Sequence, residues 1–181
     1  GPFSIRYPRG TGVMPDWRRT MKAIEVGKAR TVCDGEEVAI LTIGHIGNEA
    51  VKACQELNSE GIHPAHYDMR FAKPIDEDLL HQVFKKFKHI VTVEDGCLQG
   101  GMGSAVIEFM ADNSYHSTVV RLGIPDKVIE HGEQPQLWAE CGFDAMGIVK
   151  AVKQFAVSRA TRVMAFIMMF NEEPEGMAGV I

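Results

Sequence analysis

The chain has 181 residues, of which 45% are hydrophobic and 24% charged, and its formal net charge at pH 7 is −5. This balance is typical of an acidic globular domain with a buried core, and it excludes a chain that is disordered over most of its length. The acidic excess and the scattered Lys and Arg disfavour binding to nucleic acid or to an anionic membrane, and the longest apolar run, from Val163 to Phe170, is far shorter than the about 20 residues of a membrane-spanning helix.

Between residues 38 and 155 the hydrophobic pattern alternates between two periods. Short β-branched runs are followed by segments whose apolar residues recur at helical spacing. Strands are predicted at 38–43, 63–69, 89–94 and 118–122, and helices at 48–60, 75–87, 104–111 and 144–155. Residues 21–31 are predicted to add an antiparallel strand at one edge. The alternation indicates a three-layer α/β fold, in which a mostly parallel five-stranded sheet with one antiparallel edge strand lies between two layers of helices.

The chain contains four cysteines, Cys33, Cys54, Cys97 and Cys141. No two of them have the spacing of a zinc knuckle or of a redox dithiol, which indicates reduced thiols in a cytoplasmic protein. His63 and His66 are close in sequence, but side chains three residues apart in an extended segment point to opposite faces, so no metal site is predicted. The chain begins with Gly1 and no signal pattern follows, which favours a piece cut from a longer protein.

Arginines stand where a phosphate or carboxylate could bind. Ligands of parallel sheets gather at the carboxyl ends of the strands, and Arg70 ends the second predicted strand there. Its guanidinium is a planar fork of donors suited to such anions. Asp68, two residues earlier, is an alternative partner, and the spacing alone favours that ion pair. Arg6 and Arg9 flank a rigid Tyr-Pro and form a basic corner that suits a phosphate if another element meets it.

The third predicted strand leads into Glu94-Asp95 and then into the turn Gly100-Gly-Met-Gly103. Amides freed in such a turn can bind an anion, and paired carboxylates can transfer protons. The turn lacks the full dinucleotide-binding spacing and the Lys of a P-loop, so tight packing of the turn against the sheet is favoured. Glu94 is then expected to bond to nearby backbone donors or to a partner subunit. Structural or interface roles are therefore predicted for Glu94, Gly100, Gly101 and Gly103.

Several segments, in this order and spacing, resemble the C-terminal third of the 1-deoxy-D-xylulose-5-phosphate synthase family. The segments are Ile5-Arg-Tyr-Pro-Arg-Gly10, Ile43-Gly44, Tyr67-Asp-Met-Arg-Phe71, Lys73-Pro-Ile-Asp76, Thr92-Val-Glu-Asp95, Gly100-Gly-Met-Gly-Ser104 and Gly123-Ile-Pro-Asp126. The resemblance covers about Phe3 to Val152. It is more specific than any one motif, because the pairing of Tyr-Pro-Arg-Gly with Asp-Met-Arg-Phe separates this family from other transketolase-like proteins.

The resemblance implies a transketolase C-terminal-like domain of a cytoplasmic, homodimeric transferase. Such an enzyme uses thiamine diphosphate and Mg²⁺ to condense pyruvate with D-glyceraldehyde 3-phosphate. The products are CO₂ and 1-deoxy-D-xylulose 5-phosphate, a precursor for isoprenoid, thiamine and pyridoxal biosynthesis. The resemblance assigns binding of the acceptor phosphate to Arg9 and Arg70, which reverses the preference for an Arg70–Asp68 pair. Arg6 is a weaker candidate, because its neighbourhood matches but its role does not follow.

The resemblance also implies how the chain is divided. Residues 1–35 are expected to be the end of a preceding pyrimidine-type domain and a linker, 36–158 the C-terminal-like domain, and 159–181 a tail outside the family pattern. In this family the diphosphate and Mg²⁺ motif and the activating glutamate lie in earlier domains. This chain is therefore expected to contain no catalytic residue, to hold no cofactor or metal, and to be inactive alone.

Three alternatives stay open. The chain could be the C-terminal domain of transketolase itself or of the E1 β subunit of a 2-oxoacid dehydrogenase. It could also be a stand-alone, non-catalytic module of the same fold that binds a phosphorylated ligand or a protein partner.

Overall fold

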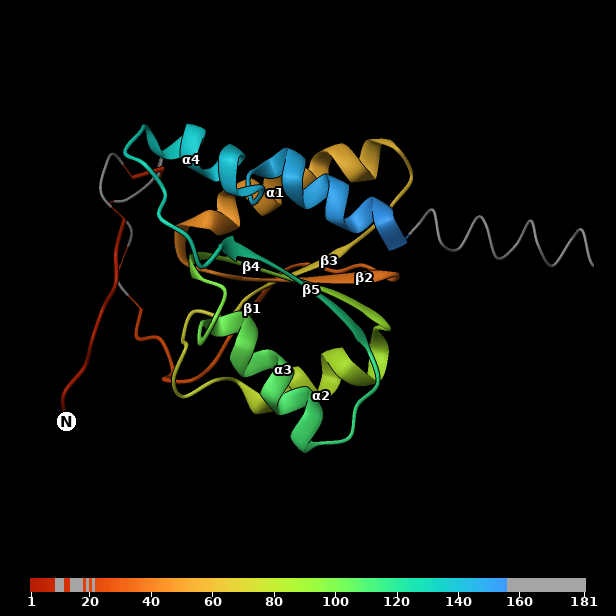
Figure 1. Ribbon diagram of the computed structural model, residues 1–181. Helices are drawn as coiled ribbons and strands as arrows, with labels where there is room; N and C mark the ends of the chain where they lie inside the picture. The colour runs from red at the N-terminus through yellow and green to blue at the C-terminus, as the bar shows by residue number, and fades with distance from the viewer. Residues whose placement is uncertain (9–11, 14–17, 19, 21, 156–181) are drawn as a thin grey trace, which may run out of the picture.

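A five-stranded mixed sheet forms the centre of the protein in a computed structural model that describes residues 1–8, 12–13, 18, 20 and 22–155. The strand order is β1-β3-β2-β4-β5 (Figure 1). The strands are β1 (Arg30–Cys33), β2 (Val38–Ile43), β3 (Ala65–Asp68), β4 (His89–Cys97) and β5 (Thr118–Ile124). β1 pairs antiparallel with β3, whereas β2 with β3, β2 with β4 and β4 with β5 are parallel. The predicted parallel sheet with an antiparallel edge strand is confirmed.

Helices cover both faces of the sheet, which confirms the three-layer architecture. On one face lie α1 (Gly47–Ser59), α4 (Gln134–Cys141) and the helical residues 145–155, and on the other lie α2 (Glu77–Lys86) and α3 (Met102–Asp112) (Figure 1). A short 3₁₀ turn, η1 (Gly44–Ile46), joins β2 to α1. Right-handed crossovers between parallel strands account for this division of the helices.

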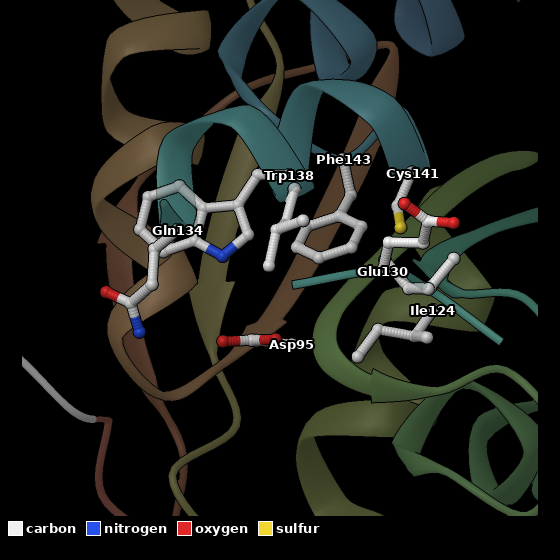
Figure 2. A pocket seen from close by; sticks show the side chains of 9 residues that line it. Asp95, Ile124, Glu130, Gln134, Trp138, Cys141 and Phe143 are labelled. Carbon is white, nitrogen blue, oxygen red and sulfur yellow. The ribbon is translucent and has the colours of Figure 1, made fainter. Parts of the chain in front are cut away.

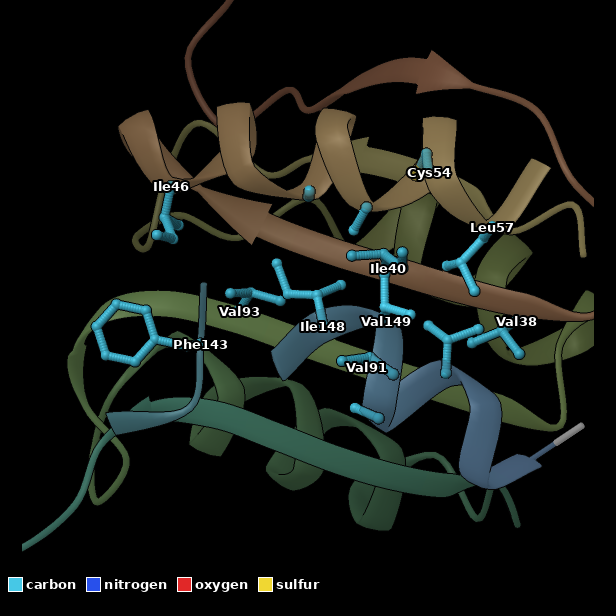
Figure 3. Packing of buried hydrophobic residues seen from close by; sticks show 14 of the residues in the cluster. Val38, Ile40, Ile46, Cys54, Leu57, Val91, Val93, Phe143, Ile148 and Val149 are labelled. Atoms are coloured by element: carbon cyan, nitrogen blue, oxygen red, sulfur yellow. The ribbon is translucent and has the colours of Figure 1, made fainter. Parts of the chain in front are cut away.

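The central strand β2 is buried on both faces. Successive side chains of a strand point to opposite faces, so Val38 and Ile40 join the cluster beneath α1 and residues 145–155, whereas Ala39 and Leu41 join the cluster against α2 and α3. Figure 3 shows Ile40 at the middle of the first cluster, between α1 and the helix of residues 145–155. This explains why 38–43 is a continuous apolar run rather than an alternating one.

The sequence pattern misplaced the start of one strand and missed one helix. The antiparallel edge strand begins at Arg30, not at residue 21, because Gly27 has a φ of 75° and Lys28 forms an ion pair with Asp78, 2.6 Å away, which ties this stretch to α2. The sequence pattern also missed α4, which is only 8 residues long and has no fully buried residue, although Trp138 and Cys141 pack against the core in part. Its signal was a capping box of Glu133 and Gln136, with a proline in the first turn.

His66 is a buried histidine on β3. His66 on β3 is 1% exposed, and its Nε2 lies 2.8 Å from the hydroxyl of Thr42 on β2. Its Nδ1 has no hydrogen-bond partner among the described residues. Burial disfavours the charged imidazolium and lowers the pKa of His66 to about 4.

The free energy of unfolding is expected to decrease as the pH is lowered, because of this histidine. Its pKa is lower in the folded chain than the ordinary value of about 6.5, so protons bind the unfolded chain more tightly. The stabilisation is complete above pH 6.5 and is lost as the pH falls to about 4, by roughly 3 kcal/mol. The free energy of unfolding can be measured with urea at several pH values for His66→Gln and for the unchanged chain. Between pH 6.5 and 4 it should fall less steeply with falling pH in the variant. Equal slopes would contradict this account, and the difference at pH 8 measures the cost of the substitution itself.

Candidate functional site

The carboxyl ends of the four parallel strands lie together along one side of the sheet, called the carboxyl edge below, which is not the same as the edge strands β1 and β5. The segments that follow them are 44–47 after β2, 68–70 at the end of β3, 94–103 at the end of β4, and 123–126 at the end of β5. In a parallel α/β sheet this edge is where ligands bind, because the crossovers leave the strand ends and helix starts open there. The sequence-predicted residues of the described chain lie in these segments or in the N-terminal arm, residues 1–8.

Arg70 has an unusual backbone and an unengaged side chain. Its φ of 57° lies in the left-handed region, and its backbone N–H donates a 3.1 Å hydrogen bond to Asp68 Oδ1. The other oxygen of Asp68 accepts a 3.0 Å hydrogen bond from Arg30 Nε. The Arg70–Asp68 ion pair that spacing favoured is therefore replaced by an Arg30–Asp68 pair. Within the described residues, the Arg70 guanidinium has no hydrogen bond or ion pair, so its donors are available to an anion.

The N-terminal arm contacts this edge from outside the sheet. The Arg6 guanidinium donates a hydrogen bond to the backbone oxygen of Asp95, at the end of β4. The Phe3 ring packs edge-on against Phe71, with the ring centroids 6.3 Å apart, directly beside Arg70. Arg6 therefore holds the arm to the carboxyl-terminal part of β4, while Arg9 lies outside the described residues.

Glu94 is bonded to the turn that follows it. Its side chain is 5% exposed, and its two oxygens accept hydrogen bonds from the backbone amides of Met102, at 2.8 Å, and Gly103, at 2.9 Å. These amides begin α3, where the helix dipole favours a negative charge. The Glu94 carboxylate thus occupies the position in which a bound anion would lie. The amides of Met102 and Gly103 are therefore already bonded and are not available to a diphosphate.

The glycines of this turn are required by space and by backbone conformation. A Cβ at Gly101 would overlap the carbonyl oxygen of Cys97, and one at Gly103 would come within 2.5 Å of the Thr92 hydroxyl. Gly100 has a φ of 72°, which side chains rarely adopt. Larger residues here would push α3 away from β4.

A shallow cavity beneath α4 was not predicted from sequence. It has a volume of about 230 Å³, and Figure 2 shows Trp138 and Phe143 facing it, with the Asp95 carboxylate nearby. Its lining residues are Asp95, Ile124, Ile129, Glu130, Gln134, Leu137, Trp138, Cys141 and Phe143. His45 Nε2 lies 3.2 Å from Asp95 Oδ2. Neither His45 nor Trp138 belongs to a motif, so no sequence signal singled them out.

The family resemblance implies thiamine diphosphate and Mg²⁺ in the full-length enzyme. Over residues 1–8, 12–13, 18, 20 and 22–155, no cluster of three His, Cys, Asp or Glu could hold a metal ion. All four cysteines are free thiols. The described residues thus form no cluster of three such side chains for Mg²⁺.

A search of the same described residues found no helix with the length and apolar character needed to cross a membrane.

The protein has a five-stranded mixed sheet with one antiparallel edge strand, and a Gly-rich turn whose amides bond to a glutamate. These features are those of a transketolase-type C-terminal domain. The family model described as "Transketolase, C-terminal domain" matches residues 27–148. The chain belongs to this family.

Similar proteins agree with this assignment. The chain is 62% identical over 156 residues to the 1-deoxy-D-xylulose-5-phosphate synthase of Cytophaga hutchinsonii, covering 86% of this chain and 24% of that protein. It is 51% identical over 154 residues to the synthase of Parabacteroides distasonis, covering 85% and 24%. The chain thus spans about a quarter of the length of these curated relatives.

Two solved structures share the fold. One is described as "Split gene transketolase, inactive beta4 tetramer"; it superposes with a TM-score of 0.68 at 31% identity, covering 73% of this chain and 43% of that one. The other is the transketolase of Campylobacter jejuni, with a TM-score of 0.52 at 14% identity, covering 71% and 18%. The second likeness shows the fold alone.

Removal of the Glu94 carboxylate should destabilise the chain. Glu94→Ala leaves the amides of Met102 and Gly103 without an acceptor, and we expect the free energy of unfolding to fall by about 2–4 kcal/mol. Glu94→Gln keeps one acceptor oxygen and should lose less. Urea unfolding measures both, with Glu108→Ala on the exposed side of α3 as the control, expected within about 0.5 kcal/mol of the unchanged chain. A loss no larger than that of the control would contradict the capping role.

Proposed function

We propose that this chain is the C-terminal domain of a 1-deoxy-D-xylulose-5-phosphate synthase. This enzyme condenses pyruvate with D-glyceraldehyde 3-phosphate and releases CO₂. The observation that carries the proposal is the 62% identity over 156 residues to a protein of that name. The lower identity of 31% to a split-gene transketolase favours the synthase over transketolase itself.

Within that enzyme, the chain contributes to binding of the acceptor phosphate through Arg70 and Arg9. The unengaged guanidinium of Arg70, at the carboxyl edge of the sheet, supports its part of this role. A guanidinium can donate two parallel hydrogen bonds to a phosphate, which both attracts and orients the acceptor. Arg6 is a weaker candidate, because its guanidinium already donates to the Asp95 backbone oxygen.

The remaining components come from outside this chain. We propose that residues 1–35 are the end of a preceding pyrimidine-type domain and a linker, of which 30–33 join the sheet as β1. Residues 36–158 then form the C-terminal-like domain, and 159–181 form a tail outside the family pattern. Thiamine diphosphate and Mg²⁺ are then held by the earlier domains, in a cytoplasmic homodimer. The residues encoded just before Gly1 distinguish this proposal from a stand-alone binding module, which would have no such domains.

The acceptor-phosphate role predicts a selective kinetic defect. In the full-length gene product, Arg70→Ala should raise the KM for D-glyceraldehyde 3-phosphate about 10–100-fold, because charge-assisted hydrogen bonds of about 1.5–3 kcal/mol are lost. Pyruvate decarboxylation should survive. Steady-state kinetics measure both, and Lys150→Ala, which removes an exposed positive charge elsewhere, should behave like the unchanged enzyme. Unchanged acceptor kinetics in Arg70→Ala would remove the assignment.

The division of labour predicts that the isolated chain binds no cofactor. Titration calorimetry of these 181 residues with thiamine diphosphate and Mg²⁺ should give no binding heat, whereas the full-length product should bind. Tight Mg²⁺-dependent binding by the isolated chain would contradict the proposal.

A further inference from the structure

The backbone at Arg70 is held in a conformation that an arginine does not favour. Its φ of 57° brings Cβ close to the following carbonyl group, which is unfavourable for residues other than glycine. Such a conformation persists only where neighbouring contacts enforce it. The direction in which the Arg70 side chain leaves the sheet therefore depends on whatever holds this backbone.

Two hydrogen bonds hold this turn. The Phe71 N–H donates to the Met69 backbone oxygen at 2.5 Å and closes a three-residue turn around Arg70 itself, and Asp68 accepts the second bond. The hydrogen bond from the Arg70 N–H to Asp68 Oδ1, 3.1 Å long, spans two residues and closes an Asx turn, which fixes the direction of the Arg70 N–H. On the other side of the turn, the Met69 N–H donates to the Thr42 backbone oxygen at 2.8 Å, and the Met69 side chain is fully buried. Met69 thus anchors the turn to β2, and Asp68 orients the peptide group that leads into Arg70.

Arg30 holds the Asp68 carboxylate in place. Arg30 lies opposite Asp68 in the antiparallel register of β1 with β3, and its Nε donates to Asp68 Oδ2 at 3.0 Å. The Asp68 side chain is 15% exposed, so solvent screens this pair less than a fully exposed one. The pair also reduces the negative charge that Asp68 would otherwise present to an anion beside Arg70.

We propose that Asp68 is a positioning residue for Arg70 and that Arg30 orients Asp68. This inference rests on the proposed function, in which Arg70 binds the acceptor phosphate. Asp68 does not touch the acceptor: it determines the direction of the guanidinium through the backbone, and the edge strand β1 thereby contributes to acceptor binding.

The test compares acceptors with and without a phosphate in the full-length gene product. Asp68→Ala should raise the KM for D-glyceraldehyde 3-phosphate about tenfold and leave kcat unchanged. The kinetics with D-glyceraldehyde, the same acceptor without its phosphate, should not change. Asp68→Asn keeps the Oδ1 acceptor and should restore most of the loss. Asp112→Ala removes an exposed aspartate at the end of α3 and should match the unchanged enzyme.

A double variant shows whether Asp68 acts through Arg70. In the Arg70→Ala background, Asp68→Ala should add no further rise in KM, because the side chain to be positioned is gone. Arg30→Met is a second single variant that keeps the residues of the Asx turn and removes only the contact that orients the Asp68 carboxylate, and it should raise the same KM about threefold. If Asp68→Ala does not fold, Arg30→Met is the deciding variant. An unchanged KM for D-glyceraldehyde 3-phosphate in Arg30→Met would then overturn the inference.

The outcomes separate the two proposals. A raised KM in Arg70→Ala together with an unchanged KM in Asp68→Ala and Arg30→Met overturns the positioning role and leaves the proposed function standing. An equal loss with both acceptors in Asp68→Ala, or additive effects in the double variant, also overturns it. Unchanged acceptor kinetics in Arg70→Ala overturns the proposed function itself.

Discussion

The parallel pairing of β2 with β3 on one side and with β4 on the other determines where every candidate residue lies. In this register Thr42 is opposite Asp68 and Ile43 is opposite Glu94. The two carboxylates therefore stand at nearly the same level, on either side of the end of β2. Because β2 is buried on both faces, a slip by one residue would turn Ile40 and Leu41 to the wrong clusters, so packing holds the register firmly.

Carboxylates at this edge organise the backbone. Glu94 accepts from the first amides of α3, and Asp68 accepts from the amide of Arg70. Asp76 accepts from Leu79 at the start of α2 and, through its other oxygen, from Ala29 before β1. Each of the three satisfies amides that a helix start or a turn leaves without a partner. With these carboxylates engaged inside the fold, the unengaged Arg70 guanidinium is, among the residues that the structure describes, the charged group that our proposal directs to a ligand.

Much of the fold could be predicted because its signals are local. The strands and helices from Val38 to Leu122 follow apolar periods that a few neighbouring residues define, and their observed boundaries differ by a few residues. The helix α4 was missed because it is only 8 residues long and its apolar side chains are only partly buried, so its apolar period is too short to stand out. The edge strand β1 was displaced along the chain because its residues are mostly exposed and its position depends on pairing with β3.

The candidate site divides in the same way. The residues by themselves determined the alternation of strands and helices, the carboxyl edge as the place for ligands, and Arg70 as an anion-binding candidate, because strand order in sequence and residue chemistry are local properties. Only the tertiary structure decided that Asp68 pairs with Arg30 rather than with Arg70, and that the backbone donors bonded to Glu94 are the first amides of α3. Those contacts depend on strand pairing and on backbone dihedrals, which bring together groups whose distance along the chain carries no signal.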